Sequence, residues 1–153
     1  MTKVSGRLNR LAESATLAMA RMSRELQAKG VNIIALSLGE PDFDTPEFIK
    51  EAAKKAIDDN FSHYTPVPGL PELRSSISAK FKRDNHLEYT PDQIVVSTGA
   101  KQSLANVCLS LLDPEDEVLL PCPYWVSYAE IIKLAEGVPV EIKSTIDSDF
   151  KIT

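Results

Sequence analysis

The apolar residues of this chain recur with two different spacings. In several stretches they return every three or four residues, the period of one face of an α-helix. These stretches cover residues 15–26, 49–57, 70–81, 104–111 and 128–135. Shorter apolar runs, typical of β-strands, occupy residues 31–38, 93–96, 117–121 and 138–142. From residue 93 onward the predicted order is strand, helix, strand, helix, strand, which indicates an α/β fold with a largely parallel sheet.

Local signals mark where some of these elements begin and end. Gly30 follows a lysine and suits the C-terminal cap of the first helix. Pro46 is predicted at the first position of the second helix, where a missing N–H is harmless. Thr98 is the predicted N-cap of the helix that contains Leu104. In the last strand, Pro139 indicates an edge position or a bulge, because proline cannot donate to a ladder.

A soft domain boundary is predicted near Asp44. It separates an N-terminal arm and helix, residues 1–44, from the α/β region, residues 45–153. By the end of the chain the predicted sheet has fewer strands than the usual five or six. We therefore expect the chain to be the front part of a longer protein.

The segment 93–104 carries the first candidate for chemistry. An extended run there turns through Ser97, Thr98 and Gly99 into a helix. Such a turn points several backbone N–H groups out of the positive end of the helix, where phosphate commonly binds. Lys101 lies in the first helical turn, a position that disfavours a cation unless an anion is near. An ordinary capped turn is the alternative, and this segment taken alone favours it.

The single tryptophan, Trp125, lies in a loop just after the predicted strand 117–121. Ligands of open α/β sheets bind at the carboxyl ends of the strands. Trp125 is therefore expected near the 97–101 turn, where a flat aromatic ring beside a phosphate site suits a flat, phosphorylated cofactor. The alternative is a tryptophan that covers the edge of the core.

Composition excludes several classes of partner. The 153 residues are 43% hydrophobic and 25% charged with a net charge of −5, and basic residues form no stripe. Nucleic acid and anionic membranes are therefore not expected as partners. Cys108 and Cys122 form no CxxC pair and suit the reducing cytoplasm.

No metal site is expected from the sequence. Glu40, Asp42 and Asp44 alternate as at the start of a calcium-binding loop, but the remainder of that pattern is missing. No membrane-spanning run occurs either.

Four motifs in the same order resemble a known family. They occupy residues 37–46, 64–74, 99–102 and 123–128. Together they are similar to the N-terminal part of class I (fold type I) aminotransferases, above all the bacterial aspartate aminotransferase subgroup, which depends on pyridoxal 5'-phosphate. The similarity runs over essentially the whole chain. It implies the first part of a three-layer α/β/α large domain, preceded by a helical arm that belongs to the small domain.

The resemblance also implies which residues bind the cofactor. The backbone of Gly99, Ala100 and Lys101 would hold its phosphate, and Trp125 would stack on its pyridine ring. Tyr64 would reach the phosphate in the neighbouring subunit, because members of the family are homodimers with shared active sites.

Substrate contacts follow from the same resemblance. Gly39 would meet the α-carboxylate of the amino acid through its backbone, and Trp125 would also border the substrate. Thr16 and Lys101 are candidates for the distal carboxylate of an acidic substrate. Some members carry Lys-Pro just before the Ser-Ala-Thr segment, a feature linked to prephenate as a second amino acceptor. This chain has Ala12 and Glu13 at those positions, so the sequence does not decide whether prephenate is an acceptor.

The expected activity is transamination, of aspartate with 2-oxoglutarate, by the parent protein. The Schiff-base lysine, the aspartate at the pyridine nitrogen and the carboxylate-binding arginine of the family all fall beyond Thr153. Residues 1–153 are therefore expected to supply no catalytic residue and to be inactive alone. The alternative is a non-catalytic module that binds a phosphorylated ligand or mediates dimerisation.

Overall fold

The computed structural model describes residues 3–36, 39 and 41–152. The contacts within the chain divide it into two compact units. The first unit joins Met1–Gly39 to Gly99–Thr153, and the second is Glu40–Thr98. The domain boundary near Asp44 stays a prediction.

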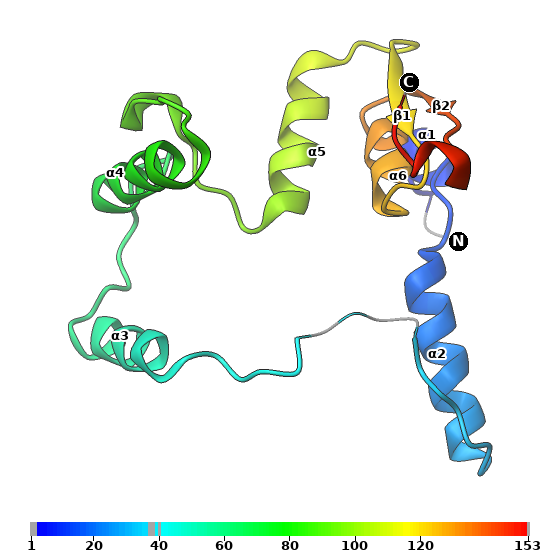
Figure 1. Ribbon diagram of the computed structural model, residues 1–153, viewed down its shortest axis with the longest axis horizontal. Coiled ribbons are helices and arrows are strands. Elements are labelled where there is room, and N and C mark those ends of the chain that lie inside the picture. The colour runs from blue at the N-terminus through cyan, green and yellow to red at the C-terminus, as the bar shows by residue number, and fades with distance from the viewer. Residues whose placement is uncertain (1–2, 37–38, 40, 153) are drawn as a thin grey trace. The chain divides into compact units, whose positions relative to one another are not determined.

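The first unit contains the N-terminal helices, helix α5 and a βαβ unit (Figure 1). Its elements are α1 (Gly6–Asn9), α2 (Ala15–Ala28), α5 (Ala100–Leu111), β1 (Glu117–Pro121), α6 (Ser127–Leu134), β2 (Val138–Ile142) and the 3₁₀-helix η3 (Ile146–Ser148). The helices expected over residues 15–26, 104–111 and 128–135 are thus confirmed, as are the strands at 117–121 and 138–142.

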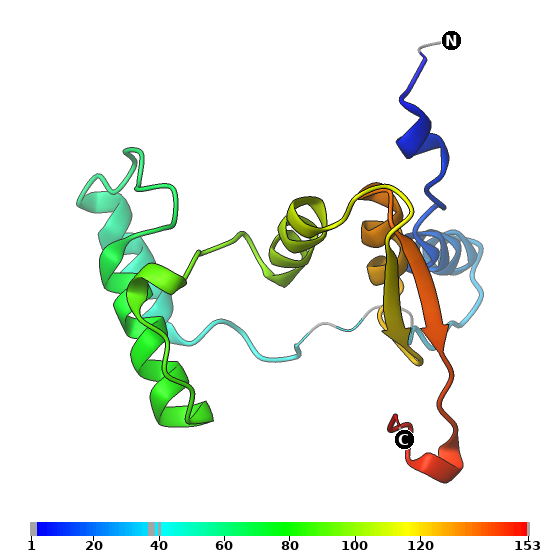
Figure 2. The same ribbon diagram turned by 90° about the horizontal axis from the view of Figure 1, so that it is seen from above.

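β1 and β2 pair in parallel and run side by side in Figure 2. The register aligns Glu117 with Val138 and Pro121 with Ile142. Parallel neighbours need a crossover connection, and α6 provides it. The core of this unit lies between the strands and α6, where Leu120 and Ile132 are buried.

Cys108 of α5 packs against this core. Burial raises the pKa of its thiol, so the side chain stays neutral and behaves as a small apolar residue. The cysteine is therefore a packing residue, as its place in an apolar pattern predicts.

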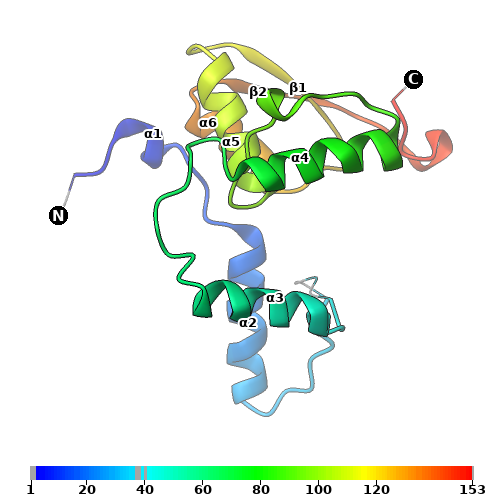
Figure 3. The same ribbon diagram turned by 90° about the vertical axis from the view of Figure 1, so that its left-hand side faces the viewer.

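The second unit is helical. It contains α3 (Glu47–Asp58), α4 (Pro71–Lys80), a π-helical turn η1 (Phe81–Asn85) and the 3₁₀-helix η2 (Pro91–Gln93). Figure 3 shows α3 and α4 joined by a loop without regular structure. Both helices and the loop are confirmed, because helical periodicity and the Pro-rich stretch between the helices are local signals.

Arg74 of α4 holds the segment that follows η2. Its side chain is only 13% exposed, and its Nε donates to the carbonyl oxygens of Pro91 at 2.8 Å and Ile94 at 3.0 Å. The N–H of Val96 donates to the carbonyl oxygen of Pro68 at 2.9 Å. These contacts fix residues 91–96 against the start of α4.

Replacing Arg74 with methionine is expected to destabilise the protein by about 2–3 kcal/mol, because two carbonyl oxygens lose a charged donor. The urea unfolding midpoint of the full-length protein measures this loss. Asp92→Asn is the matched control: the Asp92 side chain is 97% exposed, and its ion pair with Arg74 at 3.2 Å contributes little. Equal losses in the two variants would contradict the importance of the carbonyl contacts.

Two predicted strands are wrong. Residues 31–36 adopt no strand, and Leu36 is 91% exposed; residues 37 and 38 lie outside the described residues. Residues 94–97 are likewise not in a strand, although Ile94 has extended angles of φ −115° and ψ 128°. A strand requires a neighbouring strand for its ladder. Within the described residues, β1 and β2 form the sheet and neither segment joins it.

Two caps also differ from expectation. Gly99, with φ 81° and ψ 163°, is the N-cap of α5 in place of Thr98. Pro46 is the N-cap of α3, one position before the first helical residue. The glycine signal at the end of α2 is confirmed: Gly30 has φ 83°, and its N–H donates to the carbonyl oxygen of Gln27 at 2.9 Å.

Within the described ranges, none of the helices combines the length and apolar character needed to span a membrane. The same ranges contain no cluster of three or more His, Cys, Asp or Glu side chains that could hold a metal ion.

Candidate functional site

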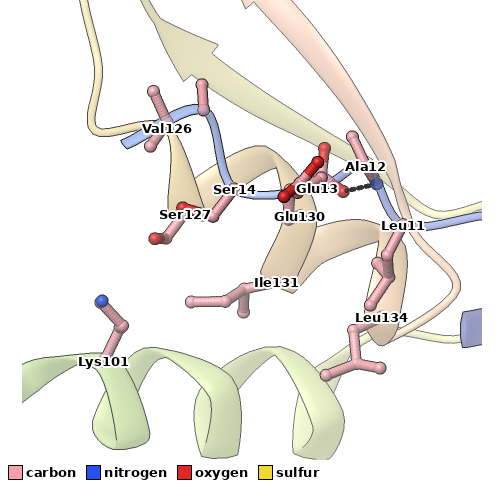
Figure 4. Close-up of a pocket in the computed structure, with 11 residues that line it drawn as sticks. Leu11, Ala12, Glu13, Ser14, Lys101, Val126, Ser127, Glu130, Ile131 and Leu134 are labelled. Carbon is pink, nitrogen blue, oxygen red and sulfur yellow. Dashed lines mark hydrogen bonds between the residues drawn. The ribbon is translucent and has the colours of Figure 1, made fainter. Parts of the chain in front are cut away.

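A pocket of about 370 Å³ lies in the first unit beside the start of α5. Its walls come from the segment 11–15, from Lys101 and from the region 126–134 around α6. Figure 4 shows Lys101 extending from α5 toward Ser127, with Glu130 next to Ala12. Most of the lining is apolar, so the few polar groups at its edges define what the pocket can orient.

Gly99 makes the start of α5 accessible. Its φ of 81° lies in the region that favours glycine, and no heavy atom is within 4 Å of where a Cβ would stand. The first N–H groups of a helix have no acceptor inside the helix, and they carry the positive end of its dipole. The backbone at Gly99, Ala100 and Lys101 can therefore receive an anion.

Lys101 and Trp125 come together in the structure. The Nζ of Lys101 lies 5.7 Å from the centroid of the Trp125 ring. A cation over an aromatic face at this range contributes about 0.5–1 kcal/mol at an exposed site. Trp125 is 46% exposed, so part of its surface is open to a ligand. The expected convergence of the Trp125 loop with the start of α5 is present.

The loop that carries Trp125 is anchored on both sides. Before it, the N–H of Cys122 donates to the carbonyl oxygen of Ile142 at 2.9 Å, and the Ser144 hydroxyl donates to the carbonyl oxygen of Cys122. After it, the N–H of Tyr128 donates to the carbonyl oxygen of Trp125 at 2.9 Å. The Cys122–Pro123 peptide bond is cis.

Tyr124 ties the same loop to β2. Its hydroxyl donates to Oε1 of Glu141 at 2.6 Å. This bond to a carboxylate, together with partial burial and the negative charge of Glu141, raises the pKa of Tyr124 to about 12. The phenol therefore stays neutral and keeps donating across the ordinary pH range.

The Tyr124 bond predicts a pH dependence of stability. The folded-state pKa of about 12 exceeds the ordinary 10.0, so the stabilisation is complete below about pH 10 and disappears as pH rises through about 12. The difference in unfolding midpoint between the native full-length protein and Tyr124→Phe should be constant from neutral pH to about pH 10 and shrink above it. Glu141→Gln should bring tyrosinate absorbance back toward pH 10. A difference that grows above pH 10 would contradict this.

The other predicted site residues are more dispersed. Thr16 is half-buried in the first turn of α2, next to the 11–15 wall but not among the lining residues. Gly39 is exposed and has no heavy atom within 4 Å of a would-be Cβ. Tyr64 is fully exposed in the loop of the second unit. Their roles stay predictions.

Glu130 and Ser127 line the pocket but are absent from the sequence-based site. Glu130 lies in the first turn of α6, just after the Trp125 loop. Its closeness to Trp125 in the sequence is the one feature that could have marked it as a site residue. One of its partners is the N–H of Ala12, 118 positions away along the chain. No local pattern encodes such a contact.

Comparison with known proteins identifies the family. The profile of the family described as aminotransferase class I and II matches residues 31–153. A probable aspartate/prephenate aminotransferase of Rickettsia bellii is 50% identical over the whole of this chain, which covers 38% of that relative. The aspartate/prephenate aminotransferase of Cereibacter sphaeroides is 48% identical, again over all of this chain and 38% of the relative. The chain thus spans well under half the length of these relatives.

Solved structures agree with this result. The aspartate aminotransferase from Thermus thermophilus with maleate has a TM-score of 0.93 and 43% identity, and the match covers all of this chain and 40% of that one. The enzyme from Rhizobium meliloti gives 0.95 and 42%, over all of this chain and 38% of its own. The predicted fold, the N-terminal portion of a fold type I aminotransferase, is confirmed. By sequence profile, by identity along its whole length and by fold, this chain belongs to the class I and II aminotransferase family.

Proposed function

We propose that the full-length protein containing this chain is a pyridoxal-phosphate-dependent aminotransferase that transfers the amino group of aspartate to 2-oxoglutarate. The observation that carries the proposal is the approach of Lys101 to Trp125 beside the open start of α5. Family membership and the names of the relatives, which include aspartate as substrate, support it.

The residues at the start of α5 fit the cofactor. The accessible backbone at Gly99, Ala100 and Lys101 would bind its phosphate, and the exposed part of Trp125 would stack on its ring. When bound, pyridoxal phosphate supplies an electron sink for breaking the Cα–H bond of the amino acid. The chain's own contribution is to hold and orient, and we assign no catalytic acid or base within residues 1–153.

An acidic substrate fits the pocket. Lys101 is a cation at the edge of a mainly apolar pocket, and a distal carboxylate would neutralise it there. The two carboxylates of the lining, Glu13 and Glu130, are already paired with Arg21 and Lys133. Thr16 would donate a further hydrogen bond, and Gly39 would meet the α-carboxylate through its backbone. The Thermus thermophilus relative was solved with maleate, itself a dicarboxylate, which supports this assignment.

The proposal includes a homodimer with shared sites. Tyr64 is fully exposed, and a side chain in that state is suited to reach a cofactor phosphate held by another copy. Residues 1–44 would form part of the small domain and residues 45–153 the first part of the large domain. A cytoplasmic location rests on the two free cysteines, which suit a reducing compartment.

The test uses the full-length protein supplied with pyridoxal phosphate. Aspartate and 2-oxoglutarate should yield oxaloacetate and glutamate in equal amounts, followed through reduction of the oxaloacetate. Borohydride treatment followed by peptide mapping should label a lysine outside residues 1–153. Cofactor binding without amino transfer from any amino acid would instead support a non-catalytic module that binds a phosphorylated ligand.

Prephenate belongs in the same assay, because the names of both curated relatives include it. In this chain Glu13 lines the pocket and pairs with Arg21 at 3.3 Å. Prephenate and 2-oxoglutarate each carry two carboxylates, so the charge of Glu13 does not discriminate between them. The assay compares the two acceptors directly.

A further inference from the structure

We propose that Glu130 is a positioning residue that holds the segment 11–14 as one wall of the Lys101 pocket and thereby sets the affinity for the amino-acid substrate. This inference rests on the proposed function. The contact between Glu130 and Ala12 lies entirely within this chain. Hydrogen exchange can therefore report on it without any measurement of activity.

Both carboxylate oxygens of Glu130 are engaged. Oε2 accepts the N–H of Ala12 at 2.9 Å, and Oε1 accepts Nζ of Lys133 at 2.8 Å. The side chain is 26% exposed and itself lines the pocket (Figure 4). Glu130 therefore connects α6, which carries it, to a segment that is distant in sequence.

The segment 11–14 depends on such a contact because it has no regular secondary structure. It runs between α1 and α2, and each of its residues lines the pocket. A backbone N–H bound to a carboxylate is a charge-assisted hydrogen bond, about twice as strong as a neutral one. Loss of the Glu130 carboxylate would leave the Ala12 N–H to water and allow the wall to move.

The opposite wall is firmer. Ile131 and Leu134 belong to α6, and Lys101 belongs to α5. The size of the pocket, and the distance over which a substrate carboxylate meets Lys101, are therefore set by where the segment 11–14 rests. Fixing this wall acts on substrate binding and not on the reacting bond.

A second contact on the same arm supplies a matched control. Glu136 accepts Nη2 of Arg10 at 2.7 Å and Nη2 of Arg7 at 3.5 Å. These side chains are at least a third exposed, and Glu136 does not line the Lys101 pocket. Surface ion pairs of this kind contribute little. Removing Glu136 loosens the arm outside the pocket and leaves the wall in place.

The experiment compares Glu130→Ala, Glu130→Gln and Glu136→Ala in the full-length protein with its cofactor. Glu130→Ala should raise KM for aspartate about tenfold and change kcat by less than about twofold, the pattern of lost uniform binding. Glu130→Gln keeps an acceptor for the Ala12 N–H and should restore most of the affinity. Glu136→Ala should leave KM near the native value.

Hydrogen exchange at the Ala12 amide gives the second readout. It should accelerate in Glu130→Ala and stay close to native in Glu136→Ala. Unchanged KM and exchange in Glu130→Ala, or equal effects of Glu130→Ala and Glu136→Ala, would overturn the positioning role. Absence of amino transfer in the native protein would overturn the proposed function instead, and the Ala12 exchange would still decide whether Glu130 holds the segment.

Discussion

Gly69→Ala is expected to destabilise the protein by about 2–4 kcal/mol, the sum of backbone strain and overpacking. Gly69 has φ 103°, a conformation that side chains rarely adopt. A Cβ there would lie 2.7 Å from Cγ2 and 2.8 Å from Cβ of Val96. Val96 cannot withdraw without cost, because its N–H is bonded to the carbonyl oxygen of Pro68.

Gly30→Ala separates the two causes. Gly30 has φ 83°, but no heavy atom lies within 4 Å of its would-be Cβ. The Gly30→Ala variant should therefore lose only the stability that backbone strain costs, about 1–2 kcal/mol. Urea unfolding midpoints of both variants in the full-length protein make the comparison. If Gly69→Ala costs no more than Gly30→Ala, the close approach to Val96 is not what requires glycine.

Lys101→Met is expected to lower kcat/KM for aspartate by about 30- to 1000-fold, since loss of a charged partner for a bound carboxylate costs about 2–4 kcal/mol. The side chain is replaced while its backbone N–H stays, so the cofactor phosphate should still bind. An amino acid without a distal carboxylate, such as alanine, should lose far less. Steady-state kinetics with both substrates measure the difference.

The control for this variant is Lys54→Met. Lys54 pairs with Glu51 at 2.6 Å on an exposed part of α3, distant in sequence from Lys101, and no site role is predicted for it. The Lys54→Met variant should leave kcat/KM unchanged for both aspartate and alanine. Equal losses for aspartate and alanine in Lys101→Met would contradict a role in the distal carboxylate and point to the cofactor. Lys101→Arg should retain part of the aspartate activity, because it keeps the charge but not the geometry.

The elements predicted correctly are those whose cause is local. Helical periodicity located α2, α3, α4, α5 and α6 to within a few residues. The strands β1 and β2 were also predictable, because each is a short apolar run and the helical pattern between them implies the crossover. The runs at 31–38 and 93–96 have similar composition but lack a neighbouring strand among the described residues. The composition of a segment does not show whether a neighbouring strand is present to pair with it.

The candidate site divides in the same way. The approach of Trp125 to Lys101 was expected because both follow predicted strands, and the contact is present although residues 93–96, before Lys101, form no strand among the described residues. The hydrogen bond from the Ala12 N–H to Glu130 could not be expected from the sequence. It joins two distant segments through one backbone group and one side chain. The hydrogen bonds from Arg74 to the carbonyl oxygens of Pro91 and Ile94 also join distant positions, so the sequence does not predict them either.

By itself, the sequence determined the helices, the βαβ order and the family motifs, because each depends on neighbouring residues or on their spacing. Only the tertiary structure decided which runs become strands, why Gly69 admits no side chain and which carboxylate holds the wall of the pocket. These depend on atoms that folding brings together from distant positions. Glu130 and Ala12 meet because α6 packs beside the arm, and no pattern near either residue records it.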